Sequence, residues 1–200
     1  MRRESALPGL AAWGRVADYR LYQLRQMGNV SLFANSEITA ETVGDFGADH
    51  VLVASGSHWG NDGFGSTRFS AVPGFADAAL SVDAVMDGAK VSGSVVIYDD
   101  DHYYMGNILA SVLAKRGLEV TIITPQATLA GWMGSTLEQP RVIAELAGLG
   151  VRVLTNHAAT GFKDGVLDLV VANTGAPAVP VEAATLIPVG RPHADPRLPR

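Results

Sequence analysis

Apolar and polar positions follow a strand–helix–strand pattern between residues 94 and 123. The run Val95–Tyr98 is continuously apolar, as expected for a strand buried on both faces. Residues 104–116 follow a helical period, and Lys115, Arg116 and Gly117 are typical of a helix C-terminus. Val120–Ile123 is a second buried run. The pattern predicts a β-α-β unit, which is normally parallel and right-handed. We expect its strands to be central parallel strands with helices on both faces of the sheet.

Upstream of this unit, the spacing predicts a helix near Leu10–Met27 whose apolar stripe includes Trp13, Ala17, Leu21 and Leu24. A short strand is expected at Val30–Phe33, and Thr39 can cap a short helix at 42–46. The run HVLVA at His50–Ala54 has the composition of a strand buried on both faces, so we expect a central parallel strand there.

A long loop rich in glycine and proline covers residues 55–79, and loops of this length are usually functional or cross between domains. Short helices are expected at 81–88 and at 136–149, although Pro140 favours a start of the second nearer Gln139. Further strands are expected at 151–154, 160–162, 166–171 and 185–189. The tail from Arg191 has no core pattern.

The composition excludes several classes of protein. The 200 residues are 48% hydrophobic and 18% charged, with a net charge of -5, so we expect an ordered chain that does not bind nucleic acid. No apolar run approaches the roughly 18 residues of a membrane helix, and no secretory segment begins the chain. Cysteine is absent, which rules out disulfides and cysteine-ligated clusters within this sequence. We therefore expect a cytoplasmic location and no membrane partner.

The loop after Val95–Tyr98 lacks the glycines of a dinucleotide-binding fingerprint. In register with G-x-G-x-x-G, the glycine positions hold Asp99, Asp101 and Tyr104. The second strand ends in Thr124-Pro125-Gln126, which offers neither an acid for a ribose nor an arginine for a 2′-phosphate. The sequence therefore predicts a Rossmann-like unit that does not bind NAD(P).

The acidic run Asp99–His102 has two further interpretations. Carboxylates and imidazole are suitable ligands for a divalent metal ion. The alternative is a loop that caps the next helix, and it is favoured because four successive residues rarely converge on one ion. The histidines form no zinc-protease motif, and Ser55-Gly56-Ser57 is not a nucleophile elbow. We predict neither a catalytic residue nor a metal ligand.

Four segments occur in an order and spacing that resemble a known family: ESALPGLAAWGRVADYR, GADHVLVASGSHWGNDG, VVIYDDDHYYMGNILASVLAKRGLEVTIIT and WMGSTLEQPRVIAELAGLGVRVLTNH. They are similar to the C-terminal dinucleotide-binding region of the trimethylamine, dimethylamine and histamine dehydrogenases. These are iron–sulfur flavoproteins related to 2,4-dienoyl-CoA reductase and other NADH:flavin oxidoreductases. The resemblance covers about residues 1–195.

The resemblance implies an α/β fold with Rossmann-like parallel sheets, arranged as a glutathione-reductase-like pair of FAD and NAD(P) domains. Residues 1–90 would form a partial FAD/ADP-binding-like domain, incomplete at its start, residues 91–190 an NAD(P)-binding-like domain, and 191–200 a tail. An N-terminal barrel carrying FMN and a 4Fe-4S cluster would lie outside this chain. ADP or FAD would be a possible cofactor of the parent protein.

Carried onto this sequence, the resemblance assigns cofactor-binding positions. Ala54, Ser55 and Gly56 match the family's Ala-Thr-Gly turn, which passes close to the nucleotide. Trp13 and Arg15 match positions on the nucleotide side of the first domain, although Arg15 could equally be a solvated helix residue.

The function expected from the resemblance is that of a fragment of an amine dehydrogenase-like oxidoreductase, inactive by itself. The alternatives are an NAD(P)H-binding module of a dienoyl-CoA-reductase-like enzyme and a non-catalytic docking scaffold. The expected partners are the remainder of the parent flavoprotein, an electron-transferring flavoprotein, and a second copy of this chain, because an incomplete first domain should expose apolar surface.

Overall fold

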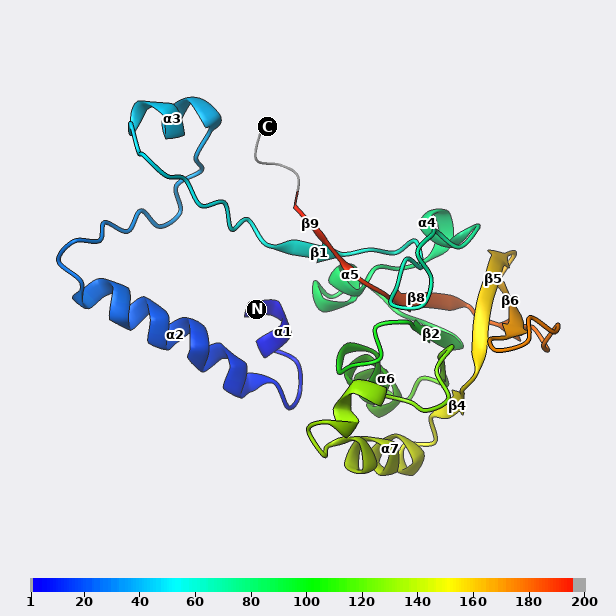
Figure 1. Cartoon of the computed structure of the whole chain (residues 1–200). Helices are drawn as coiled ribbons and strands as arrows, with labels where there is room; N and C mark the ends of the chain where they lie inside the picture. Colours follow the sequence, from blue (N-terminus) through cyan, green and yellow to red (C-terminus); the bar gives the residue numbers. More distant parts are fainter. Residues whose placement is uncertain (1, 196–200) are drawn as a thin grey trace. The chain divides into compact units, whose positions relative to one another are not determined.

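The computed structural model describes residues 2–195, and the chain divides into two compact units (Figure 1). One consists of residues 1–58 and 193–200, and the other of residues 59–192. Each unit is described separately below.

A four-stranded sheet forms the centre of unit 59–192. Its strands are β2 (Val95–Asp99), β3 (Val120–Ile123), β4 (Arg152–Leu154) and β8 (Thr185–Val189), in the order β4-β3-β2-β8. Every pairing is parallel, and Ile97 of β2 lies opposite Ile122 and Ile187. The parallel β-α-β unit predicted from the sequence is therefore confirmed.

Two helices make the crossovers between the first three strands. Helix α6 (Met105–Lys115) follows β2 and contacts β2 and β3, and helix α7 (Gln139–Gly148) packs against α6 (Figure 1). Leu109 and Leu113 of α6 are fully buried. Pro140 lies in the first turn of α7, where its missing N–H costs nothing, so the helix begins at Gln139 rather than at residue 136.

The other face of the sheet is covered mainly by a second sheet instead of the helices expected on both faces. Strands β5 (His157–Lys163), β6 (Val166–Val171) and β7 (Val181–Glu182) form an antiparallel sheet in the order β5-β6-β7. Val96 and Tyr98 of β2 pack in one apolar cluster with residues of these strands. Because successive side chains of a strand point to opposite faces, Ile97 points to the face of the sheet that α6 covers.

The segment before β2 belongs to the same unit. It contains α4 (Phe75–Ala78) and α5 (Val82–Met86), the latter capped by Ser81, whose hydroxyl accepts the N–H of Ala84. The Leu80 N–H donates to Leu186 O of β8 at 2.8 Å, and the ring of Phe75 meets Tyr98 edge-on. The contacts therefore place residues 59–90 in the same compact unit as β2. The assignment of 1–90 and 91–190 to FAD-like and NAD-like domains stays a prediction, as does the incomplete domain pair.

The unit of residues 1–58 and 193–200 holds α1 (Arg2–Ser5), α2 (Ala11–Gln26) and α3 (Ala40–Asp45). Thr39 caps α3 as predicted, because its hydroxyl accepts the N–H of Thr42 at 3.2 Å. The predicted helix near 10–27 is present as α2, but it has no buried residue, and its apolar stripe is only half covered. No helix within residues 2–195 has the length and apolarity needed to cross a membrane.

Two expectations for this unit were wrong, namely the strands at 50–54 and at 30–33. Residues 50–54 form no strand, and Val51, Leu52 and Val53 are 53%, 96% and 62% exposed. Residues 30–33 form no strand either. A run of β-branched residues becomes a strand only where a neighbouring strand pairs with it. The tail, in contrast, contributes β9 (Pro192–Ala194), which pairs with β1 (Ser57–Trp59).

Candidate functional site

The acidic loop lies at the carboxyl end of β2, between that strand and α6. Asp99 is the last residue of β2, and both Asp99 and Asp100 are fully buried. His102 is also buried and adopts a left-handed conformation with φ of 65°. In Rossmann-like folds this strand-to-helix turn is the place where a dinucleotide pyrophosphate binds.

The Asp99 carboxylate forms hydrogen bonds with the main chain of the loop that follows it. Its Oδ1 accepts the main-chain N–H groups of Asp101 at 3.2 Å and His102 at 3.1 Å. The carboxyl group occupies the space beside Gly106 in the first turn of α6, where a Cβ would lie 2.9 Å from Asp99 Cγ. Asp99 Oδ2 is buried without a hydrogen-bond partner. Burial raises the pKa of Asp99 to about 6, and burial likewise raises that of Asp101 to about 6.

Asp100 joins the loop to residues 65–68. Its carboxylate accepts the Thr67 hydroxyl at 2.7 Å and the main-chain N–H groups of Thr67 and Arg68 at 3.0 and 3.1 Å. The His102 Nε2 atom lies 2.9 Å from Asp100 Oδ1, although it is not aligned for a hydrogen bond. Gly65 packs directly on this carboxylate, and a Cβ there would overlap it.

These contacts distinguish between the interpretations of the acidic run. No group of three or more His, Asp or Glu within residues 2–195 is arranged to hold a metal ion. The helix-cap interpretation is also incomplete, because Tyr104 at the N-cap of α6 makes no side-chain cap. The carboxylates instead satisfy N–H groups of the loop itself and of residues 67 and 68.

The five predicted cofactor-binding residues all lie in the unit of residues 1–58 and 193–200. Trp13 and Arg15 belong to the first turns of α2, where Trp13 is half-buried and Arg15 is exposed. Ala54, Ser55 and Gly56 are exposed in the segment before β1. The Ser55 hydroxyl donates to Asp195 O at 3.3 Å, and the Asp195 N–H donates to Gly56 O at 3.1 Å. Gly56 has a φ of 89° and open space beside its Cα. The cofactor assignment of these residues stays a prediction.

Sequence reasoning missed Thr67 and Arg68, which lie against the acidic loop although they are more than thirty residues from it in the chain. The signal that could have found them is the length of the loop at 55–79, because a loop that long is commonly functional.

Comparison with known proteins places the chain in a family. Residues 80–176 match the model of the OYE-like second alpha/beta domain. The chain is 30% identical over 175 residues to dimethylamine dehydrogenase from Hyphomicrobium sp. (strain x), which covers 82% of this chain and 24% of that protein.

Two solved structures are similar over almost all of the chain. Histamine dehydrogenase from Rhizobium sp. 4-9 matches with a TM-score of 0.91 and 36% identity, over 98% of this chain and 31% of that one. The 6-hydroxypseudooxynicotine amine oxidase HisD from Pseudomonas geniculata N1 matches with a TM-score of 0.90 and 33% identity, over 98% and 29%. The chain thus spans about a quarter to a third of the length of these relatives. It is homologous to the dimethylamine and histamine dehydrogenases, as its sequence segments indicated, and it contains an OYE-like second alpha/beta domain.

Proposed function

We propose that this chain is a nucleotide-binding-like, non-catalytic region of a flavin-dependent oxidoreductase of the amine dehydrogenase type. The identity to dimethylamine and histamine dehydrogenases supports this proposal, as does the fraction of their length that the chain spans. The sequence has no cysteine, so its residues do not fit a cysteine-ligated 4Fe-4S cluster. The FMN and cluster chemistry of such an enzyme would belong to other parts of the parent protein.

The observation that carries the proposal is the position of the Asp99 carboxylate, which lies at the end of β2 and beside the first turn of α6. This carboxylate accepts hydrogen bonds from the main-chain N–H groups of Asp101 and His102, and it occupies the space beside Gly106. In a dinucleotide-binding domain, main-chain N–H groups and glycines in this turn receive the pyrophosphate. In this loop the Asp99 side chain therefore occupies the position that a phosphate group takes in a dinucleotide-binding domain.

Electrostatics disfavour the alternative of an NAD(P)H-binding module like that of 2,4-dienoyl-CoA reductase. A phosphate charge about 5 Å from an ionised carboxylate costs on the order of 3 kcal/mol at an effective dielectric constant near 20, before salt screening. Even about 1.4 kcal/mol of repulsion weakens binding tenfold. Three carboxylates lie in this loop, and their negative charge disfavours the binding of NAD(P).

The residues of the other unit fit a different nucleotide better. Arg15 is an exposed cation, and open space lies beside Gly56 in the turn Ala54–Gly56, which is the kind of approach that a phosphate group needs. In the parent protein Trp13, Arg15 and this turn would contact ADP or the ADP part of FAD. FAD would supply electron transfer when bound, whereas ADP would be a structural ligand.

The exposed apolar residues favour a role in docking as a second candidate. Tyr19 and Tyr22 of α2 and Leu52 are 57%, 63% and 96% exposed. Surfaces of this kind are usually covered by another protein surface. The covering surface would be the remainder of the parent flavoprotein, an electron-transferring flavoprotein or a second copy of the chain, in a cytoplasmic protein without a nucleic-acid or membrane partner.

A variant with glycine at the three fingerprint positions of the loop tests the proposed function. The triple variant Asp99→Gly, Asp101→Gly, Tyr104→Gly removes the carboxylate that occupies the phosphate position, and NADH affinity measured by calorimetry should rise by about tenfold or more. Asp164→Gly is the matched control, because it removes an exposed acid in a turn far along the chain, and it should leave affinity unchanged. A folded triple variant that binds NADH no better than the unmodified chain would show that the loop does not decide cofactor choice.

A further inference from the structure

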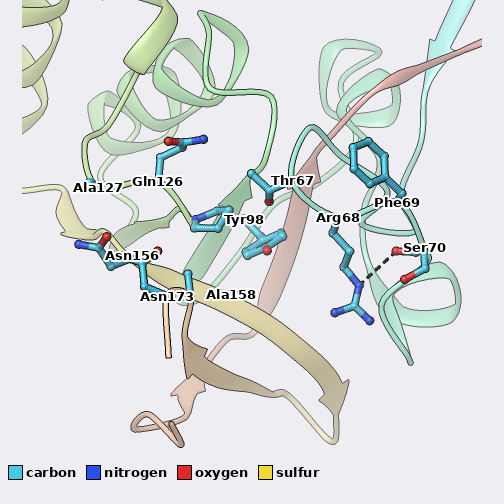
Figure 2. Close-up of a pocket in the computed structure, with 12 residues that line it drawn as sticks. Thr67, Arg68, Phe69, Ser70, Tyr98, Gln126, Ala127, Asn156, Ala158 and Asn173 are labelled. Carbon is cyan, nitrogen blue, oxygen red and sulfur yellow. Dashed lines mark hydrogen bonds between the residues drawn. The ribbon is translucent and has the colours of Figure 1, made fainter. Parts of the chain in front are cut away.

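A cleft in unit 59–192 adjoins the strand-to-helix turn described above, because Thr67 and Arg68, which bind Asp100 of that turn, also line the cleft. It has a volume of about 700 Å³ and lies between residues 67–70, the ends of β2 and β3, and the start of β5 (Figure 2). This volume is in the range of roughly 300–1,000 Å³ that is typical of small-molecule sites. Tyr98 lies between Arg68 on one side and Gln126, Asn156 and Asn173 on the other (Figure 2).

Arg68 provides a half-buried positive charge at this cleft. Its guanidinium donates to three main-chain oxygens, those of Ser70 at 3.2 Å, Ala159 at 3.1 Å and Ala71 at 3.4 Å. A guanidinium has five N–H donors, so further donors remain for a ligand. No ion pair within residues 2–195 includes Arg68. The Asp100 carboxylate accepts a hydrogen bond from the main-chain N–H of Arg68, not from the Arg68 guanidinium.

The opposite side of the cleft carries three amide side chains without partners. Gln126, Asn156 and Asn173 make no side-chain hydrogen bond to any residue in the range 2–195. The main chain that carries them is nevertheless fixed, because the Asn156 N–H donates to Gln126 O and the Ala172 N–H to Asn156 O, both at 2.8 Å. The main chain around Gln126 and Asn156 is therefore fixed, and the side-chain amides are free to bind a ligand.

The floor of the cleft carries no charge. The Tyr98 hydroxyl accepts the Ala159 N–H at 3.3 Å, and burial raises the pKa of this phenol to about 12, so it stays neutral. A ligand would thus meet one cation, three amides and a neutral aromatic floor.

We propose that this cleft binds a small hydroxy- or oxo-carboxylate, with the carboxylate on Arg68 and the hydroxyl or carbonyl groups on Gln126, Asn156 and Asn173. Arginine suits a carboxylate because both are planar and form charge-assisted hydrogen bonds. Amides both donate and accept, so they suit hydroxyl and carbonyl groups. This proposal does not depend on the proposed function, since the acidic turn only fixes the main chain of Thr67 and Arg68, and none of the predicted ADP residues lines the cleft.

Calorimetric titration of the full chain with citrate as the probe tests the site. Citrate should bind, and Arg68→Gln should weaken its binding by about tenfold, the usual effect of losing one charge-assisted contact. Asn173→Ala should weaken it by a few-fold. Asn173 is exposed, and its side chain makes no hydrogen bond within residues 2–195, so this variant should fold even if Arg68→Gln does not. Arg141→Gln, an exposed arginine of α7, is the matched control and should bind citrate normally.

Three results would overturn the proposal. The first is an absence of citrate binding. The second is binding that neither Arg68→Gln nor Asn173→Ala weakens. The third is inorganic phosphate binding as tightly as citrate, because the amides would then recognise nothing beyond a single anionic group.

Discussion

Asp99 and Asp100 are buried carboxylates that accept main-chain N–H groups, those of residues 101 and 102 and those of residues 67 and 68. Asp99 keeps one oxygen without a hydrogen bond, and its pKa is raised by burial. A group whose pKa is higher in the folded state than in the unfolded state holds its proton more tightly when folded. The folded state therefore loses stability as the pH rises from about 4, the pKa of an aspartate in the unfolded chain, to about 6, the pKa of Asp99 in the folded chain.

Asp99→Asn should remove the part of this pH dependence that Asp99 contributes, while the part that Asp101 contributes remains. The amide oxygen can still accept the N–H groups of Asp101 and His102, and no charge is buried at neutral pH. We expect the variant to be about 1–3 kcal/mol more stable than the unmodified chain at pH 7, with the difference vanishing near pH 4. Denaturant unfolding followed by circular dichroism at pH 4, 5 and 7 measures this. Asp168→Asn, at an exposed site on β6, is the control, and equal pH dependence of all three proteins would contradict the account.

Gly65 and Gly106 make room for the two buried carboxylates. Because Asp100 is held by several hydrogen bonds, it cannot move away from a Cβ at residue 65. Gly65→Ala and Gly106→Ala should each cost about 1–3 kcal/mol of unfolding free energy. Gly148→Ala in α7 meets nothing within 4 Å and should be neutral or stabilising by up to about 1 kcal/mol. Thermal unfolding measures the stability of the three variants. If all three substitutions changed stability equally, the carboxylates would not occupy the space beside Gly65 and Gly106.

At the scale of elements, local pattern predicted the parts whose neighbours are close in sequence. Strands β2 and β3 and helix α6 were predicted because helix period, a C-terminal glycine and two apolar runs agree within thirty residues. Residues 50–54 were mispredicted because burial of a strand depends on a partner that no local pattern supplies. The link between Thr67 and Asp100 joins residues 33 apart. No spacing rule in the sequence predicts such a contact.

Helix α6 should be the most sensitive helix of unit 59–192. Leu113 is fully buried in it, so Leu113→Ala leaves a cavity and should cost about 2–5 kcal/mol. Ile143 on α7 is 41% exposed, and Ile143→Ala should cost much less. Denaturant midpoints of the two variants make the test. Similar losses would mean that α6 is not packed on the sheet as described.

At the scale of the whole molecule, the two units bury very different amounts of apolar surface. Helix α2 has no buried residue, whereas β2 is buried along its whole length. We expect the isolated chain to self-associate through the exposed residues of unit 1–58. Leu52→Lys should shift light scattering towards the monomer. Val179→Lys, at a site in the other unit that is 83% exposed, should not. A monomer at every concentration for the unmodified chain would contradict this expectation.

The central claim is that the OYE-like second alpha/beta domain of this chain does not use NAD(P)H, because its own carboxylates occupy the phosphate position. Calorimetric titration of the unmodified, folded chain with NADH and NADPH tests it most directly. The account predicts no binding tighter than the millimolar range for either nucleotide. A dissociation constant in the low micromolar range would contradict it and would make the chain an NAD(P)H-binding module instead.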